Sequence, residues 1–331
     1  MNSLTDGPIG LPLDPGRLSW WGESLVRPEC VLATADGSIY TADWRGGVVH
    51  RAADGRQRLI RGELPGGQPV QPNGIALMAD STFLVAHLGA HDGGVWRLTR
   101  DGELTPWLRA VDGVDLPPTN FVLSDAQGRV WVTVSTRHRP RAAAYRGDVA
   151  DGFIVRVDGR GAEIVADGLG YTNEVAIHPD GTWLYVNETF SRCLSRFPLK
   201  PDGSLGPKEV VVRFGIGTYP DGLAFDEAGH VWVVSIVSNR VLRVAPDGRV
   251  VTWLEDCDAT HLAWTEAAWA AGTMGREHLD TAASRCLRNI SSIAFSGPDR
   301  RTAVLGCLLG DRLATFTAPV AGAMPAHWNY R

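Results

Sequence analysis

Six polar residues recur along the chain in one frame, each at the start of a short apolar run. A turn signal follows each of the first five about seven residues later, and a second apolar run begins about ten residues after the polar one; the sixth copy is more diverged. The residues are Glu29, Asn73, Asn120, Asn173, Asp221 and Ser291. Two carboxylates and three carboxamides around one axis would form an oxygen-rich site, the kind that holds a hard cation such as Ca²⁺.

Three of these residues have an alternative interpretation when each is taken alone. Asn73 and Asp221 precede glycine, and such dipeptides are common in turns. Glu29 could lie on the surface, and Asn73 could contact a substrate instead of a metal. The shared register favours a common site, because local turn chemistry does not require it. No histidine or cysteine occupies a leading position, so the ring favours Ca²⁺ over Zn²⁺, with Zn²⁺ and Mn²⁺ left open.

The elements that must position these residues follow from the same frame. Each pair of apolar runs is followed by a third run and, after a second turn signal, by a fourth. Four short antiparallel strands form a propeller blade, and successive starts lie 44, 47, 53 and 48 residues apart. We therefore predict an all-β, six-bladed β-propeller that forms a single domain over residues 1–331. The segment 18–23 should complete the last blade, and residues 256–288 should form a partly helical insertion before it.

Composition excludes several other classes of protein. The 331 residues carry a net charge of −5, which lacks the positive field that nucleic acid requires, and no apolar stretch is long enough for a membrane span. The first seventeen residues do not resemble a signal peptide, so we expect a cytoplasmic protein. The five cysteines include no Cys-x-x-Cys pair, and only two of the 32 basic residues are lysines, so neither a zinc ribbon nor a Schiff-base lysine is expected.

At these repeats the chain resembles the SGL superfamily of gluconolactonase, regucalcin and strictosidine-synthase-like propellers, which includes senescence-marker-protein-like lactonases. The resemblance covers roughly residues 20–325. It rests on the stretches Arg27-Pro-Glu-Cys30, Gln71-Pro-Asn-Gly-Ile-Ala76, Tyr171-Thr-Asn173, His178-Pro-Asp-Gly181, Tyr219-Pro-Asp-Gly-Leu-Ala-Phe225, Ser291 to Phe295, Gly297-Pro-Asp-Arg300 and Ala318-Pro-Val-Ala-Gly322.

The resemblance implies a hydrolase that depends on a divalent cation, most often a lactonase. It assigns Glu29, Asn173 and Asp221 to the metal, Asn120 to metal or substrate, and the role of base to Asp221 as well. Such a cation would polarise the ester carbonyl while a carboxylate assists the attack of water. The expected partner is a small lactone or ester, and the sequence leaves the oligomeric state open.

One departure from the family concerns the substrate. Sugar lactonases often carry an arginine two residues before the third-blade asparagine, and Pro118 stands there in this chain. This favours a small, non-sugar lactone that is less polar or aromatic.

Further residues are expected near the mouth of the ring as substrate contacts: Trp44, His87, His91, His138 and Tyr219. His87 could serve as a general base, as a histidine does in paraoxonase-like propellers; a zinc pair with His91 is disfavoured, because the neighbouring glycines oppose a helix.

Two other functions remain open at this point. The chain could be a non-catalytic propeller that binds a ligand or partner around a structural Ca²⁺. It could also be an isomerase or cyclase that uses the same metal for carbonyl polarisation. A Pictet–Spengler condensation is disfavoured, because no glutamate near Ser291 matches the catalytic glutamate of strictosidine synthases.

Overall fold

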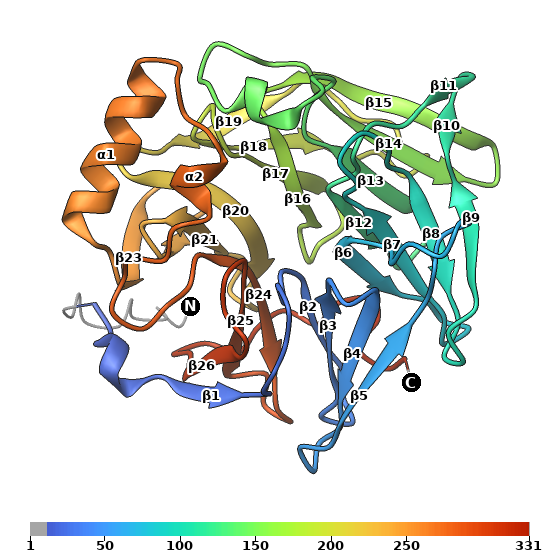
Figure 1. Cartoon of the computed structure of the whole chain (residues 1–331), viewed down its shortest axis with the longest axis horizontal. Coiled ribbons are helices and arrows are strands. Elements are labelled where there is room, and N and C mark those ends of the chain that lie inside the picture. The colour runs from blue at the N-terminus through green and yellow to red at the C-terminus, as the bar shows by residue number, and fades with distance from the viewer. Residues whose placement is uncertain (1–11, 331) are drawn as a thin grey trace, which may run out of the picture.

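The computed structural model describes residues 12–330 and consists of six four-stranded antiparallel sheets arranged in a ring (Figure 1). The predicted six-bladed β-propeller is confirmed. Blade one comprises β2 (Val31–Ala33), β3 (Ile39–Asp43), β4 (Gly47–Arg51) and β5 (Gln57–Arg61). Blade two comprises β6 (Pro72–Leu77), β7 (Phe83–His87), β8 (Val95–Leu98) and β9 (Leu104–Leu108). Blade three comprises β12 (Phe121–Ser124), β13 (Val130–Val134), β14 (Gly152–Asp158) and β15 (Gly161–Leu169).

The second half of the ring continues the pattern. Blade four comprises β16 (Thr172–Ile177), β17 (Trp183–Glu188), β18 (Cys193–Pro198) and β19 (Glu209–Arg213). Blade five comprises β20 (Thr218–Phe225), β21 (Val231–Val237), β22 (Arg240–Val244) and β23 (Val250–Glu255). Blade six comprises β24 (Ile290–Ser296), β25 (Thr302–Cys307), β26 (Leu313–Thr317) and β1 (Ser19–Trp21). A two-stranded ribbon, β10 (Ala110–Val111) and β11 (Val114–Asp115), precedes blade three.

The ring closes through the N-terminal segment, as predicted. Strand β1 pairs antiparallel with β26, with Ser19 opposite Thr315 and Trp21 opposite Leu313. A short 3-10 helix, η1 (Pro15–Arg17), leads into it. Because the last blade takes strands from both ends of the described chain, this closure gives β26 a hydrogen-bonded neighbour on each side.

Apolar layers between the blades form the core. The second strand of each blade is buried along nearly its whole length, with Val85, Trp131 and Trp232 fully buried. The fourth strands consist mostly of exposed and half-buried residues, as in β9 and β19. The innermost strands β2 and β6 are also buried along their whole length, which gives the residues at their ends fixed positions.

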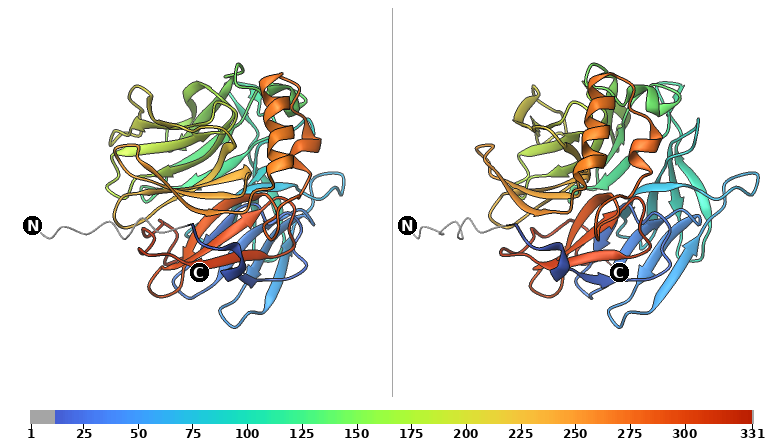
Figure 2. Two further views of the ribbon diagram at one scale, coloured as in Figure 1. Left: turned by 90° about the vertical axis from the view of Figure 1, so that its left-hand side faces the viewer. Right: turned by 60° about the vertical axis from the view of Figure 1, so that its left-hand side comes forward.

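The central opening has two ends, and the chain distributes its segments unequally between them. We call the end where the inner strands begin the upper mouth and the end where they turn into the second strands the lower mouth. The insertion lies at the upper mouth and contains α1 (Ala259–Ala270) and α2 (Arg276–Leu279). The loop between β13 and β14, which carries the 3-10 helix η2 (Arg141–Ala144), lies at the same end (Figure 2).

Four of the six inner strands have a register shift where they begin. The shifts fall between Pro72 and Ile75, Thr172 and Val175, Pro220 and Leu223, and Ile290 and Ser292. Such bulges re-aim side chains, and each one contains a leading residue of the sequence repeat. Glycine follows two of these leading residues, Asn73 and Asp221, because the next blade is close. A Cβ at Gly222 would lie 2.5 Å from the carbonyl oxygen of Ser291. Among residues 12–330, no helix combines the length and the apolar character needed to cross a membrane.

Candidate metal and substrate site

The six leading residues of the repeat lie buried at the upper mouth. Their exposed fractions range from 1% for Ser291 to 6% for Glu29. Direct contacts connect them: the Asn73 amide nitrogen donates to the backbone oxygen of Asn120 at 3.0 Å, and the Ser291 hydroxyl donates to that of Glu29 at 3.1 Å. Asn173 also hydrogen-bonds the carboxyl group of Asp221. The structure thus brings together residues that are separated by up to 262 positions in the chain.

The hydrogen-bond network fixes the orientation of two carboxamides. The hydroxyl of Thr189 donates to the carbonyl of Pro220 at 2.8 Å, so it accepts from the amide nitrogen of Asn173 at 3.0 Å. The amide nitrogen of Asn73 faces a backbone carbonyl in the same way. Both carbonyl oxygens, Asn73 Oδ1 and Asn173 Oδ1, are consequently buried without a hydrogen-bond partner. A buried acceptor without a donor is costly unless a cation or water meets it.

Asn120 differs from these two asparagines. Its amide nitrogen donates to the Ser135 hydroxyl at 2.9 Å, while its Oδ1 faces the amide nitrogen of Asn73 at 3.4 Å. This long contact leaves Asn120 Oδ1 accessible for a second interaction. Asn120 therefore lies beside the two unpartnered oxygens, where it can contact a metal or a substrate.

Three buried carboxyl groups lie close together at this end of the ring. Burial raises the pKa of Asp221 well above its usual value, and the charges of Glu29 and Glu174 raise it further. Burial also raises the pKa of Glu174 to about 8, partly opposed by hydrogen bonds from the Leu223 amide and Ser292. The charged forms of these carboxyl groups are therefore disfavoured unless a positive charge joins them.

One guanidinium group accompanies these carboxylates directly. Arg27 pairs with Glu29 through Nη2 and Oε2 at 2.9 Å, and the side chains of both are at most 9% exposed. Its charge also lowers the pKa of Asp221, against the larger effect of burial. Arg27 stacks on the ring of Trp44 at 4.5 Å from the centroid, and this stacking holds the guanidinium at the mouth. Arg27 pairs with only one of the three carboxyl groups, which leaves room for a cation.

The donor set fits a hard divalent cation. The unpartnered oxygens of Asn73 and Asn173 join the carboxylates of Glu29 and Asp221, and oxygen ligands of mixed charge suit Ca²⁺. Over residues 12–330, no group of three or more histidine, cysteine, aspartate or glutamate side chains is arranged to hold a metal. The amide oxygens are thus needed to complete the ligand set, which argues against the nitrogen and sulfur sites that Zn²⁺ favours.

Two of the other sequence candidates lie near the mouth in different roles. The Trp44 indole nitrogen donates to the backbone oxygen of Pro72, next to Asn73, at 3.0 Å. His87 is buried, and its Nδ1 accepts from the amide of Gln71 at 3.1 Å. Burial lowers the pKa of His87, while Asp92 opposes this effect. The nitrogen that could act as a base is therefore already engaged, so we give His87 the role of holding the segment before Asn73.

The remaining candidates are exposed or are bonded to other residues. His138 is half-exposed and pairs with Asp151 at 2.9 Å within the β13–β14 loop, and His91 is exposed. Tyr219 is buried, and its hydroxyl donates to Glu266 of α1 at 2.8 Å. Tyr219 thus connects blade five to the insertion and offers no free hydroxyl to a ligand.

Glu174 and Arg27 belong to the site although the repeat frame did not single them out. Glu174 directly follows Asn173, and the register shift at the start of β16 buries both side chains. In a regular strand, consecutive side chains point to opposite faces, so the alternation of the sequence does not predict that Glu174 is buried beside Asn173. In blades two and five a glycine, Gly74 or Gly222, directly follows the leading residue, whereas in blade four Glu174 does. An acidic residue at this position is the one signal in the sequence that could have revealed Glu174.

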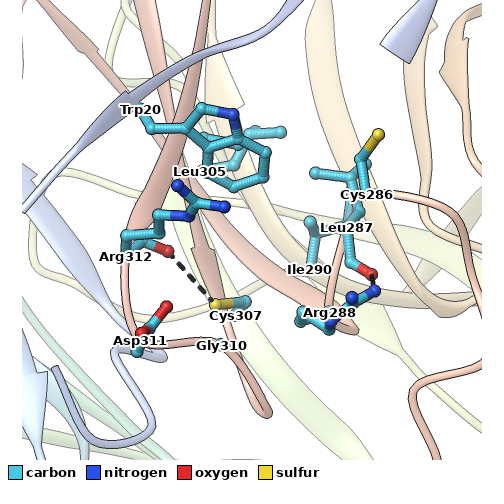
Figure 3. Close-up of a pocket in the computed structure, with 11 residues that line it drawn as sticks. Trp20, Cys286, Leu287, Arg288, Ile290, Leu305, Cys307, Gly310, Asp311 and Arg312 are labelled. Carbon is cyan, nitrogen blue, oxygen red and sulfur yellow. Dashed lines mark hydrogen bonds between the residues drawn. The ribbon is translucent and has the colours of Figure 1, made fainter. Parts of the chain in front are cut away.

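A cavity of about 180 Å³ lies elsewhere, on blade six (Figure 3). Trp20, Cys286 and Arg312 are among its lining residues, and Cys307 contacts the Arg312 backbone oxygen within it. A second cavity lies between the insertion and blade four, beside Phe190 and Trp269. Neither is lined by a leading residue of the repeat.

Comparison with known proteins matches the sequence of this chain to a family. The model described as "SMP-30/Gluconolactonase/LRE-like region" matches residues 27–263, which include five of the six leading residues. The chain belongs to the SMP-30/gluconolactonase/LRE-like family. The match begins at Arg27 and ends within α1, so the insertion and the last blade lie largely outside it.

Two relatives of known activity and one solved structure illustrate the family. The chain is 31% identical to a 6-deoxy-6-sulfogluconolactonase of Pseudomonas putida over 233 residues, which cover 68% of this chain and 74% of that one. It is 28% identical to pentonolactonase XacC of Haloferax volcanii, over 64% and 68% of the two chains. The structure of regucalcin from Agrobacterium tumefaciens, a calcium-binding protein, superposes with a TM-score of 0.66 at 20% identity over 94% and 98% of the chains.

Proposed function

We propose that this protein is a divalent-cation-dependent lactonase, a hydrolase of cyclic carboxylic esters. The observation that supports this most is the pair of buried amide oxygens without partners beside a carboxylate cluster. A propeller that served only as a scaffold would have no need of such a costly arrangement. The lactonase names of two relatives agree with it.

In this proposal Glu29, Asn173 and Asp221 hold the cation, and Asn73 and Asn120 complete or border its shell. Ca²⁺ is the favoured ion because the donors are oxygens, with Mn²⁺ and Zn²⁺ as alternatives. When bound, the cation supplies polarisation of the lactone carbonyl. The bulges that carry Asn173 and Asp221 hold these donors in place before the substrate arrives, since Asn187 donates to the Asp221 backbone oxygen at 2.9 Å.

The side chain of Asp221 acts as the base. Its carboxylate accepts a proton from a water molecule as the water oxygen forms a bond to the carbonyl carbon. The ring C–O bond then breaks, and the proton returns to the departing alkoxide. The product is an open-chain hydroxy acid, and Asp221 is regenerated as a carboxylate.

The identity of the lactone, sugar or non-sugar, is the less constrained part of the proposal. Pro118 stands where sugar lactonases often carry an arginine, which supports a non-sugar lactone, whereas the names of both relatives denote sugar lactonases. The experiment is hydrolysis of a panel of sugar and non-sugar lactones with added Ca²⁺, Mn²⁺ or Zn²⁺, with and without chelator.

We expect turnover of at least one lactone that chelation abolishes and the favoured cation restores, and that Asp221→Ala removes. Activity that survives both chelation and Asp221→Ala would rule out the mechanism. Inactivity on every lactone, while Ca²⁺ still raised the Tm, would instead favour a non-catalytic propeller with a structural cation.

A further inference from the structure

Three arginines from distant parts of the chain lie at the upper mouth, Arg27 on the carboxylate cluster and Arg141 and Arg276 together beside Tyr145. Arg27 precedes blade one, Arg141 begins η2 in the β13–β14 loop, and Arg276 begins α2 of the insertion. The charge of Glu29, on blade one, acts on Arg141, which is attached to blade three. The Arg141 side chain also contacts Tyr171, two residues before Asn173, so it lies close to the leading residue of blade four.

Two phenol groups hold Arg141 and Arg276 in place. The Arg141 guanidinium donates to the Tyr171 hydroxyl at 3.2 Å, and Arg276 hydrogen-bonds Tyr145. The rings of Tyr145 and Tyr171 pack edge to face, with centroids 5.5 Å apart. Burial acts to raise the pKa of Tyr145, but the two guanidinium groups outweigh it and lower this pKa. Each arginine is therefore held by a buried tyrosine, although part of the Arg276 side chain remains exposed.

The insertion is anchored on the same cluster. Met274 and Leu279 are buried with Tyr145, Tyr171 and Phe190 in one apolar layer, and the indole of Trp269 donates to the Phe190 backbone oxygen at 3.3 Å. In Figure 2 the helices of the insertion stand beside the loop that carries η2. The insertion thus brings Arg276 to the mouth of the ring.

The positive charge of this cluster is only partly neutralised by the protein. Arg276 pairs with Asp280, and Arg27 pairs with Glu29, a proposed cation ligand. Among the residues that the structure describes, Arg141 forms no ion pair, and its hydrogen bond is to the neutral Tyr171. A divalent cation held by Glu29 and Asp221 would balance those two carboxylates, and Glu174 can offset the charge of Arg27. The guanidinium charge of Arg141 would then still remain for a ligand.

We propose that Arg27, Arg141 and Arg276 form an anion-binding rim that selects lactones bearing an oxyanion substituent, a carboxylate or a sulfonate. Guanidinium groups bind such groups through two parallel N–H···O bonds, which orients the lactone as well as attracting it. This inference rests on the proposed lactonase function for its substrate, and the charged substituent can be carried by a sugar or a non-sugar ring. It also gives the insertion a role in specificity.

The first test compares two lactones that differ only in charge. The γ-butyrolactone carrying a carboxylate on its γ-carbon is compared with the corresponding carboxamide, and a sulfonate replaces the carboxylate in a third arm. We expect the wild type to favour the anionic lactones in kcat/KM by at least tenfold, and Arg141→Gln to remove this preference. Arg56→Gln is the matched control, because Arg56 is 85% exposed in the β4–β5 turn at the lower mouth.

The second test does not need catalysis. Tetrahydrofuran-2-carboxylate lacks the ester carbonyl, so its binding is measured by the rise in Tm of the Ca²⁺-loaded protein, against the neutral tetrahydrofuran-2-carboxamide. We expect a rise with the anion alone, lost in Arg141→Gln and in Arg276→Gln and kept in Arg56→Gln. If no lactone is hydrolysed, the lactonase proposal fails while this binding test still decides the rim.

Equal kcat/KM values for the charged and neutral lactones would overturn the inference. So would a preference for the anion that Arg141→Gln leaves unchanged, or a Tm rise that is the same with the anion and the neutral amide. A preference for only one of the two oxyanions would confirm the rim and identify the substituent.

Discussion

Both ends of the inner strands bury polar side chains, but the two ends differ in how completely these side chains are hydrogen-bonded. At the lower mouth, Asp226 accepts hydrogen bonds from two backbone amides, from the Trp232 indole at 3.0 Å and from Arg243 at 2.8 Å. Asp125 in blade three repeats this arrangement with Trp131 and Arg129. At the upper mouth, by contrast, Asn73 and Asn173 leave carbonyl oxygens without partners.

This difference separates what the fold needs from what a ligand needs. The carboxylates at the lower mouth fasten a turn to the strand that follows it, so their hydrogen bonds are complete within the protein. The oxygens at the upper mouth are buried just as deeply, yet nothing in the described chain completes their hydrogen bonds. We infer that the lower mouth stabilises the ring and that the upper mouth is prepared for a cation. Each prediction below changes one end of the inner strands and measures stability, cation binding or turnover.

The largest effect should come from the upper mouth. Asp221→Asn removes the proposed base and one charge from the cation site, while the side chain keeps its size. We expect kcat on the best lactone to fall by about a thousandfold. The free energy of unfolding in urea should stay the same or increase, because the substitution relieves repulsion among buried carboxylates. A variant that kept wild-type turnover would remove Asp221 from the mechanism.

The corresponding change at the lower mouth should have the opposite outcome. Asp226→Asn leaves Arg243 without its charged partner and weakens the bond to Trp232, and we expect a loss of about 3 kcal/mol in the free energy of unfolding. Ca²⁺ affinity of the folded protein should be unchanged, which calorimetry can measure. If Asp226→Asn clearly lowered the Ca²⁺ affinity and left the stability intact, the proposed difference between the two ends would be wrong.

A titratable group at the lower mouth should make stability, but not cation binding, depend on pH. Burial lowers the pKa of His327 to about 4, although a hydrogen bond with the Ala33 backbone opposes this. The unfolded chain then binds a proton first, near pH 6.5, so stability is complete above that pH and is lost as the pH falls toward 4. We expect a loss of about 2 kcal/mol between pH 7 and pH 5.

Urea unfolding at several pH values tests this expectation. His327→Gln removes the titrating group, so its stability should change less between pH 7 and pH 5 than that of the wild type. An equally steep loss in His327→Gln would show that the pH dependence arises from other residues.

The smallest effect concerns one amide oxygen. Asn173→Ala removes the unpartnered Oδ1, and we expect Ca²⁺ affinity to fall at least tenfold, which is about 1.4 kcal/mol. The rise in Tm on adding Ca²⁺ should shrink accordingly, whereas the exposed Asn329→Ala should behave as the wild type. An unchanged Ca²⁺-dependent rise in Asn173→Ala would place the cation elsewhere or nowhere.

The sequence predicts the ring and its leading residues because both follow from a strict repeat. The turn at Asp226-Glu-Ala-Gly229 and the frame around Asp221 recur closely enough to reveal the blades and the end where the polar residues meet. The closing strand β1 follows from the need to complete blade six, and it pairs with β26 as expected. Local spacing is therefore sufficient for the fold.

The rest of the site depends on features that spacing does not record. Glu174 enters the carboxylate cluster only because a bulge buries two consecutive side chains. Arg141 and Arg276 reach the mouth from a loop and from the insertion, neither of which repeats. Conversely, Tyr219 lies next to a leading residue in the sequence, yet its hydroxyl is bonded to α1. Side chains contributed by non-repeating segments can be placed only by tertiary packing.

Titration of Ca²⁺ into chelator-treated protein, followed by calorimetry, tests the central claim most directly. The claim is that the unpartnered oxygens of the upper mouth hold one divalent cation. We predict one site per chain in the wild type and in Asp226→Asn, and no measurable binding in Asp221→Asn under the same conditions. The account would be contradicted by the absence of stoichiometric binding in the wild type, or by binding that Asp221→Asn leaves intact.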